Sequence, residues 1–282
     1  MMFIKKSKLI NSIDMSRYFI NTFCFILFFS TMYSQEKMDL SSHLKQPKSL
    51  VINSVGEMYI CNTLSHSIEK YNPFNESVST IAENLNFPQN IALDQSGNIF
   101  ITDSFSKSIK KFDIKTQTIS TVISGLNFPT GIAVDKDENI FFADAENHEI
   151  KKFNLKTKIT TTLVNKGLSY PHGLFLDTLG NLYIADTFND EIKKLNLSTN
   201  QITTLSIEGL SFPESIFVYN SEVYVTDTDN ACLKKYNETT HKTDIVLDKN
   251  LKKPSALFID KKGVLYLADK ELNQIFKINI KP

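Results

Sequence analysis

The residues with the most varied chemistry in this sequence follow six evenly spaced prolines. The prolines lie 41 or 42 residues apart, at Pro47, Pro88, Pro129, Pro171, Pro213 and Pro254. The side chains directly after them differ from copy to copy: Lys48, Gln89, Thr130, His172, Glu214 and Ser255. Varied polar groups on the loops of a rigid framework are a typical way to build a specific binding site. We therefore predict a ligand-binding set at these positions; the simpler alternative is that they are ordinary solvated loop residues.

A metal-dependent reaction would need a fuller set of ligands than these positions offer. Catalytic zinc is usually held by about three protein side chains of the His, Asp or Glu type. His172 and Glu214 come from neighbouring repeats, and the other four positions provide no convincing third ligand. The sequence also shows no Ser/His/Asp arrangement, glycine-rich phosphate loop or Cys/His cluster. We therefore assign no catalytic residue, no metal ligand and no cofactor.

Carboxylates recur at another position of the repeat, where they invite a metal or catalytic interpretation. They are Asp103, Asp144, Asp186, Asp227 and Asp269, with Asn62 in the first repeat. Each ends a short apolar run at a predicted turn, where Asp and Asn side chains accept backbone N–H groups two residues on. We therefore predict a structural role.

Lys-Lys pairs recur as well, at 110–111, 151–152, 193–194 and 234–235. Their even spread predicts a solvated outer surface instead of a phosphate-binding track.

Two aromatic residues stand at the tips of predicted turns, Phe105 and Phe188. Tight turns rarely need an aromatic tip, and exposed apolar groups beside polar ones suit contact with a protein, a peptide or a glycan. We therefore add both residues to the predicted ligand-binding set. The alternative is that each ring folds back onto its own repeat.

Charge and composition weigh against nucleic acid as a partner. Without residues 1–34, a predicted targeting segment, the chain keeps 27 cations (31 minus 4) and 30 anions (31 minus 1), a net charge of −3. The single arginine, Arg17, lies in that segment, and arginine is the preferred side chain for contacts with phosphate and guanine. Two cysteines remain, Cys61 and Cys232, and their places in non-adjacent repeats predict free thiols.

The first 34 residues have the organisation of a secretory signal. Basic residues precede an apolar run from Phe19 to Phe29. Its strictly apolar core, Phe23 to Phe29, is much shorter than the roughly 20 residues that span a bilayer. We predict a signal peptide over residues 1–34 and an exported protein, periplasmic or extracellular. The alternative is an uncleaved membrane anchor, and we expect membrane contact only in that case.

The repeat itself predicts the fold. Units begin near residues 44, 85, 126, 168, 210 and 251, and we expect one domain over residues 35–282. In each unit an apolar run follows the proline, a turn such as Asp94–Gly97 follows, and the next run is apolar on both faces. Four short strands in about 41 residues are typical of a propeller blade. We predict an all-β fold, a six-bladed β-propeller of four-stranded antiparallel blades.

The last unit predicts how the ring closes. It stops at Pro282 after three strands, so we expect residues 37–41 to add the outer strand of the last blade and remove its exposed edge. Strand direction then places the residues after the prolines around the mouth of a central channel. The next residues are all small or short, as a crowded axis requires: Ser49, Asn90, Gly131, Gly173, Ser215 and Ala256.

These units resemble NHL repeats, as the third unit shows in Pro129–Asp135, Asn139–Asp144 and Asn147–Phe153. The resemblance covers nearly the whole chain after residue 34, and it implies a six-bladed ring. Some similar six-bladed propellers are peptidyl-hydroxyglycine lyases or gluconolactonase-like lactonases, which use a metal ion. We predict a monomeric binding module that uses the top face and the channel mouth. A lactonase or lyase that depends on a divalent cation is the alternative.

Overall fold

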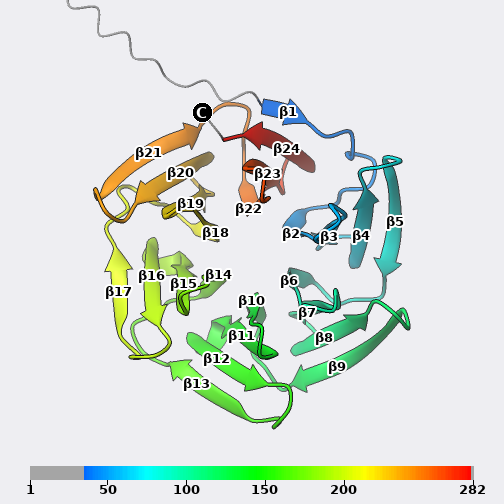
Figure 1. Ribbon diagram of the computed structural model, residues 1–282, viewed down its shortest axis with the longest axis horizontal. Helices are drawn as coiled ribbons and strands as arrows, with labels where there is room; N and C mark the ends of the chain where they lie inside the picture. Colours follow the sequence, from blue (N-terminus) through cyan, green and yellow to red (C-terminus); the bar gives the residue numbers. More distant parts are fainter. Residues whose placement is uncertain (1–34, 281–282) are drawn as a thin grey trace, which may run out of the picture. The chain divides into compact units, whose positions relative to one another are not determined.

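The computed structural model describes residues 35–280, which form six four-stranded sheets around a central axis (Figure 1). Each sheet is one blade, and all neighbouring strands within it are antiparallel. This confirms the predicted six-bladed propeller. The predicted signal segment, residues 1–34, lies outside the described residues. Within residues 35–280, no helix has both the length and the apolar character that a membrane crossing requires.

The blades are numbered along the chain, and the strands of each blade follow one another from the axis outwards. Blade 1 contains β2 (Pro47–Ile52), β3 (Met58–Asn62), β4 (Ser67–Asn72) and β5 (Ser77–Ala82). Blade 2 contains β6 (Pro88–Leu93), β7 (Ile99–Asp103), β8 (Ser108–Asp113) and β9 (Thr118–Ser124). Blade 3 contains β10 (Pro129–Val134), β11 (Asn139–Asp144), β12 (Glu149–Asn154) and β13 (Thr160–Val164).

The other three blades repeat this order. Blade 4 contains β14 (Pro171–Leu176), β15 (Asn181–Asp186), β16 (Glu191–Asn196) and β17 (Ile202–Leu205). Blade 5 contains β18 (Pro213–Tyr219), β19 (Glu222–Asp227), β20 (Cys232–Asn237) and β21 (Lys242–Leu247). Blade 6 contains β22 (Pro254–Ile259), β23 (Val264–Asp269), β24 (Gln274–Asn279) and β1 (Gln35–Lys37). Short 3-10 helices lie between the second and third strands of blades 3 and 4: η2 (Ala145–Asn147) and η3 (Thr187–Asn189).

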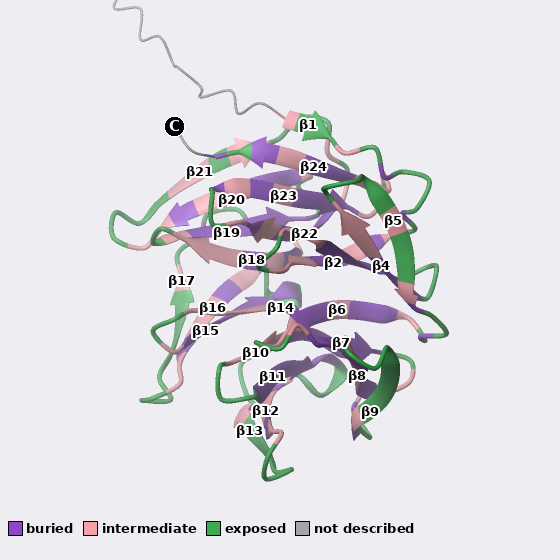
Figure 2. Ribbon diagram, turned by 45° about the vertical axis from the view of Figure 1, so that its right-hand side comes forward, coloured by how far each residue is buried: buried purple, intermediate pink, exposed green. Residues whose placement is uncertain are grey.

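In blades 1 to 5 burial is greatest at the second strand, and it falls towards the rim (Figure 2). Every residue of β3, β7, β11 and β15 is buried. These strands are covered on both faces by neighbouring blades, so both faces are apolar. The outer strands β9, β13 and β17 are mostly exposed, and half of the residues of β5 are exposed. Cys61 and Cys232 are buried free thiols, as predicted.

The Asp-x-x-Gly signal forms the turn between the first and second strands. In blade 2, Asp94 Oδ1 accepts the backbone N–H groups of Ser96 and Asn98, each at 2.9 Å. Gly97 has a φ of +83°, in the left-handed region that glycine enters without steric cost. The turn sets the register of β6 against β7 and thereby decides which residues of β6 reach the axis.

The recurring aspartates have a structural role, as predicted, but mostly through other partners. Asp144 is fully buried, and its Oδ1 accepts the backbone N–H of Asn127, 17 residues earlier, at 2.6 Å. In blade 6, Asp269 Oδ1 does accept the N–H of Glu271, two residues on, at 3.1 Å. The aspartates therefore anchor the loop that leads into their own blade as well as the turn that follows them.

The same aspartates change the interpretation of the Lys-Lys pairs. Lys151 Nζ lies 2.6 Å from Asp144 Oδ2, and its side chain is 17 % exposed. The equivalent pairs are Lys110 with Asp103, Lys193 with Asp186, and Lys234 with Asp227. The prediction of a simply solvated surface is therefore wrong for the first lysine of each pair, which a buried carboxylate draws inwards. The second lysine stands over an aromatic ring in blade 3, where Lys152 Nζ is 5.6 Å from the ring centre of Phe141.

The N-terminal strand completes blade 6 (Figure 1). β1 pairs antiparallel with β24 over Gln35–Lys37, so the predicted strand at 37–41 starts two residues and ends four residues too late. The strand ends early because apolar residues draw the chain away from the rim. Leu40 and Leu44 are 2 % and 1 % exposed, in an apolar cluster between blades 6 and 1.

Candidate functional site

Two sets of loops share one end of the ring, which we call the top face. One set leads into the innermost strands, and the other joins the second and third strands. The two sets touch in blade 2, where the backbone N–H of Phe105 donates to Asn86 O at 3.0 Å. The residues after the six prolines begin the innermost strands, so the structure places them at the top of the central channel.

The axis of the ring is as crowded as predicted. A Cβ atom on Gly131 would lie 1.9 Å from His172 O, and one on Gly173 would lie 2.4 Å from Glu214 O. Both distances are far below van der Waals contact with backbone atoms that cannot move aside. Glycine at these two positions therefore lets β10, β14 and β18 approach one another closely enough to hold the channel mouth together.

Three charged side chains meet at the mouth of this channel, and we call them the ion cluster: Lys48, Glu214 and Lys270. The Glu214 side chain is 2 % exposed, and its Oε1 accepts from Lys48 Nζ at 2.9 Å and from Lys270 Nζ at 2.6 Å. The three residues come from blades 1, 5 and 6, so the cluster links three neighbouring blades across the point where the ring closes. Burial alone would raise the pKa of Glu214, but the two ammonium groups outweigh it and hold that pKa at about 2. The carboxylate is therefore ionised at neutral pH.

His172 stands beside the ion cluster as an uncharged ring. Its ring centre lies 5.7 Å from that of Tyr170 and 6.3 Å from that of Phe212. Burial lowers the pKa of His172 to about 3, and the two lysines add to this effect while Glu214 opposes it. Burial also lowers the pKa of Lys270 to about 8, against the attraction of Glu214. The mouth therefore combines a neutral imidazole, an ionised carboxylate and an ammonium group that titrates near neutrality.

Thr130 and Ser255 are used differently from the other predicted site residues. They are 1 % and 2 % exposed, and their hydroxyl groups donate to the carbonyl oxygens of Pro171 and Pro47, each at 2.7 Å. These hydrogen bonds tie one blade to the next. Both side chains therefore point to a neighbouring strand and present little surface to a ligand at the mouth.

Two polar atoms at the top of the channel have no partner among the described residues: Gln89 Nε2 and Glu214 Oε2. Their residues are 5 % and 4 % exposed. A buried polar atom without a hydrogen bond is rare and costly, so these two atoms are the unsatisfied polar groups of the mouth. Within residues 35–280, no three His, Cys, Asp or Glu side chains are grouped closely enough to hold one metal ion.

Six aromatic residues form a continuous arc over blades 2 to 5 of the top face. We call them the aromatic arc: Phe87, Phe105, Phe128, Tyr170, Phe188 and Phe212. Phe105 stacks on Phe87 with ring centres 4.5 Å apart, and Phe188 stacks on Tyr170 at 4.6 Å. Phe128 links these pairs, 5.8 Å from Phe105 and 5.9 Å from Tyr170. Phe212 extends the arc, 5.7 Å from Phe188.

The two predicted aromatic residues remain largely open to solvent within this arc. Phe105 is 57 % exposed and Phe188 is 56 % exposed. Each ring also stacks on an aromatic residue of its own repeat. The alternative prediction, that each ring folds back onto its own repeat, is therefore correct in part. The result is a pair of supported rings whose outer faces are accessible.

Five residues of this region lie outside the predicted site, although each carries a signal in the sequence. Four directly precede the repeat prolines: Phe87, Phe128, Tyr170 and Phe212. Their φ angles of +51° to +63° lie in the left-handed region, which is uncommon for bulky residues and concentrates at functional sites. The fifth is Lys270, which follows a recurring aspartate where the other blades carry Thr, Ser or Ala.

Comparison with known proteins supports the fold. The sequence model of the NHL repeat matches residues 126–153. A chain of a nidogen/laminin complex is 22 % identical, with a TM-score of 0.70 over 75 % of this chain and 84 % of that chain. Virginiamycin B lyase from Staphylococcus aureus is 12 % identical, with a TM-score of 0.71 over 88 % of this chain and 100 % of the lyase chain.

A gluconolactonase from Xanthomonas campestris has a TM-score of 0.74 at 11 % identity, over 84 % of this chain and 86 % of that chain. A comparison with curated protein sequences finds no match. At these identities the likeness shows the fold alone, and the neighbours include both a chain from a protein complex and two enzymes.

Proposed function

We propose, on the premise that this chain is a six-bladed β-propeller of NHL repeats, that it is a binding module whose ligand docks on the top face. The ligand is a protein segment, a peptide or a glycan that covers the aromatic arc and reaches the channel mouth. The predicted signal at residues 1–34 supports export to the periplasm or the cell exterior, where we expect a monomer.

The aromatic arc is the observation that carries this proposal. Exposed aromatic rings dominate binding energy at interfaces because they bury a large apolar area with few rotatable bonds. Phe105 and Phe188 are more than half exposed, and each is held by a ring stacked beneath it. A rigid, pre-organised apolar surface loses little conformational entropy on binding. The arc therefore has the properties of an interaction surface.

The channel mouth supplies polar specificity next to this surface. His172 contacts Tyr170 and Phe212 of the arc and lies in the field of the ion cluster, so the two features are continuous. Gln89 Nε2, a donor, and Glu214 Oε2, an acceptor, lack partners among the described residues, and a peptide or a glycan carries polar groups of both complementary kinds.

A paired substitution of the two exposed rings tests the proposal. Random peptides on phage and an array of glycans are screened against the purified protein, and every binder is then measured with the Phe105→Ser/Phe188→Ser variant. We expect binders to lose at least about 10-fold in affinity, which is about 1.4 kcal/mol. Phe74→Ser is the matched control, because Phe74 is 81 % exposed in the turn between β4 and β5, away from the arc.

The control decides between a specific surface and general stickiness. Binders that keep their affinity for Phe74→Ser and lose it for the paired variant support docking on the top face. The proposal fails if binders respond equally to both variants, if they ignore the paired variant, or if neither collection yields a binder.

A metal-dependent lactonase or lyase remains the alternative function, and the chemistry of the mouth is the observation in its favour. Neutral imidazole is a common metal ligand, and His172 is uncharged beside the ionised carboxylate of Glu214. Turnover of an aldonolactone or a peptidyl hydroxyglycine that requires added Mg²⁺, Mn²⁺ or Zn²⁺ would favour this alternative. The activity should then disappear in Glu214→Gln and persist in Phe105→Ser/Phe188→Ser.

A further inference from the structure

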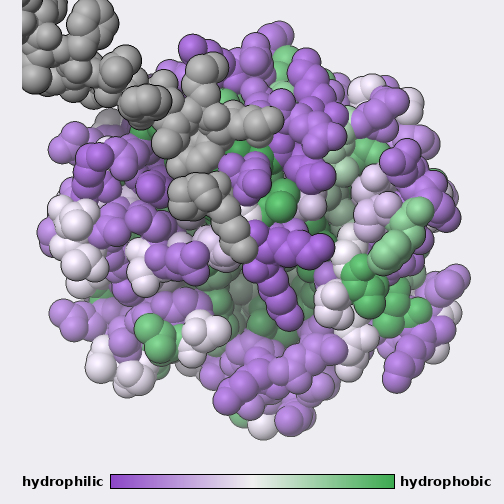
Figure 3. Space-filling model, turned by 45° about the horizontal axis from the view of Figure 1, so that its top comes forward, coloured by the Kyte–Doolittle hydropathy of each residue, from purple (hydrophilic) through white to green (hydrophobic). Residues whose placement is uncertain are grey.

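A cavity of about 280 Å³ continues down the centre of the ring, below the ion cluster and away from the aromatic arc. All six innermost strands line it. Lys48 lies at its upper end, and Ile52, Leu93 and Leu176 lie at the far ends of β2, β6 and β14. Figure 3 shows hydrophobic residues inside a hollow near the middle of the ring, between hydrophilic residues around it.

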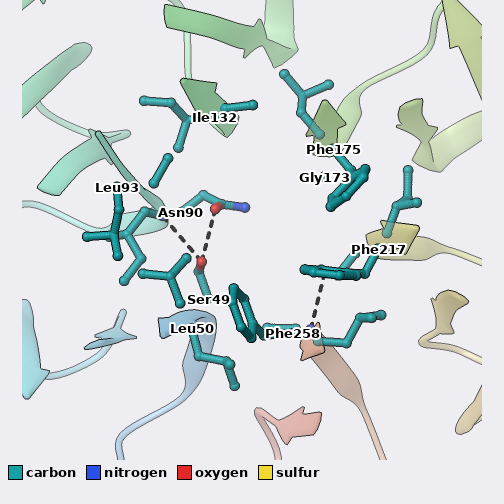
Figure 4. A pocket seen from close by; sticks show the side chains of 18 of the residues that line it. Ser49, Leu50, Asn90, Leu93, Ile132, Gly173, Phe175, Phe217 and Phe258 are labelled. Atoms are coloured by element: carbon teal, nitrogen blue, oxygen red, sulfur yellow. Dashed lines mark hydrogen bonds between the residues drawn. The ribbon is translucent and has the colours of Figure 1, made fainter. Parts of the chain in front are cut away.

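Three phenylalanines form one wall of this cavity (Figure 4). The ring centre of Phe217 lies 4.7 Å from that of Phe175 and 5.2 Å from that of Phe258. All three side chains are partly exposed, although they belong to the innermost strands. Leu93 and Ile132 lie on the opposite side. A row of partly open aromatic rings facing aliphatic groups suits a flat apolar molecule between them.

One hydrogen-bond donor points into this apolar space. Ser49 Oγ accepts the backbone N–H of Ile91 at 3.3 Å and donates to Asn90 Oδ1 at 2.9 Å. Because the hydroxyl group donates to Oδ1, the Asn90 amide is oriented with Nδ2 on its other side. Figure 4 shows this nitrogen directed into the cavity, and it has no hydrogen-bond partner among residues 35–280. The cavity thus offers the Asn90 amide as a donor, with the hydroxyl groups of Ser49 and Ser215, in a lining made mostly of apolar side chains.

Charge sets a further condition on the occupant. Among the described residues that line the cavity, Lys48 is the one ionisable side chain, and its ammonium group binds Glu214 at 2.9 Å. An ion in the apolar part would lose its hydration without gaining a counter-ion, which is strongly unfavourable. The occupant is therefore uncharged.

We propose that this central cavity is a binding site for a small, uncharged, ring-containing molecule that carries a carbonyl oxygen. Its ring lies against Phe175, Phe217 and Phe258, and its carbonyl oxygen accepts from Asn90 Nδ2. An apolar cavity of about 150 Å³ holds benzene, so a cavity of this size holds roughly ten non-hydrogen atoms. The site is independent of the docking surface on the top face, and either proposal can fail without the other.

Acetophenone and ethylbenzene are matched probes for this site, because they share a ring and differ mainly in the carbonyl group. Titrations of the purified full-length protein, followed by NMR, give the affinity of each probe. We expect acetophenone to bind with a Kd below about 1 mM and ethylbenzene about 10-fold more weakly. Asn90→Ala should abolish that difference, and Phe217→Leu should weaken both probes. Phe105→Ser/Phe188→Ser should change neither affinity, which separates this test from that of the top face.

A measurement on the unsubstituted protein covers the case in which Asn90→Ala fails to fold. Acetophenone should shift the side-chain amide resonances of Asn90, and ethylbenzene should leave them in place. The proposal is overturned if neither probe binds below about 10 mM, if Asn90→Ala preserves the preference for acetophenone, or if the Asn90 amide resonances respond equally to both probes.

Discussion

Replacing Glu214 by glutamine removes the single anion that holds two buried cations at the channel mouth. The substitution keeps the size of the side chain and leaves Lys48 and Lys270 without a counter-charge. Their side chains are 12 % and 15 % exposed, so water replaces the lost carboxylate poorly. Both ammonium groups bind the same oxygen of Glu214, which means that they repel each other at short range once the charge is gone.

The size of the effect follows from burial and from the pKa of Lys270. Breaking a buried ion pair by removing one partner costs about 3–5 kcal/mol. We expect about 3 kcal/mol at pH 7, because Lys270 has a pKa of about 8 and can release its proton. Without Glu214 the pKa of Lys270 falls further. As the pH rises, Lys270 therefore loses its proton, and the folded protein becomes more stable, at a lower pH in the variant than in the original protein. The difference in the free energy of unfolding should therefore shrink between pH 7 and pH 9.

Urea unfolding followed by far-ultraviolet circular dichroism measures this difference at both pH values. Asp229→Asn is the matched control, since Asp229 Oδ1 also binds a lysine, Lys253, at 2.7 Å. The side chains of Lys253 and Asp229 are 37 % and 47 % exposed, so this change should cost less than about 1 kcal/mol. If Glu214→Gln costs no more than Asp229→Asn, or if its effect is the same at pH 7 and pH 9, the cluster is solvated and our reasoning about the mouth is wrong.

Further predictions concern pH, packing and ring closure. Burial lowers the pKa of His172 from 6.5 to about 3, so the unfolded chain takes up a proton at a higher pH than the folded protein does. The free energy of unfolding should therefore fall by up to about 2.7 kcal/mol from pH 6.5 to pH 4.5. This fall should be absent in His172→Gln. Asp144→Asn should lower the free energy of unfolding, measured in urea, by about 3 kcal/mol. The reason is that the Lys151 side chain, which is only 17 % exposed, loses the buried carboxylate that it pairs with. Gly173→Ala should lower the melting temperature strongly, because its Cβ would lie 2.4 Å from a backbone oxygen, and an unchanged melting temperature would contradict the crowded axis. Deleting residues 35–37 should cost about 2 kcal/mol and expose the edge of β24, which light scattering would detect as self-association.

The number of blades and the order of their strands follow from the sequence alone. Prolines every 41 or 42 residues mark the start of each innermost strand, and the turn around Gly97 recurs with them. Such signals are local, because proline, glycine and aspartate act on the backbone conformation of their own neighbourhood. Repetition makes them dependable, since each copy has to form the same strands as the others. The position after the proline was also identifiable as a place where copies differ.

The arrangement of the site was decided by the tertiary structure. The nitrogen of Lys48 meets a carboxylate 166 residues away, and Lys270 reaches that carboxylate from 56 residues away. Thr130 has the same place in the repeat as Lys48, yet its hydroxyl group bonds to the next blade. The reason is that burial, pKa and the direction of a side chain depend on neighbours in space, and the closed ring brings those neighbours together from blades far apart in the chain.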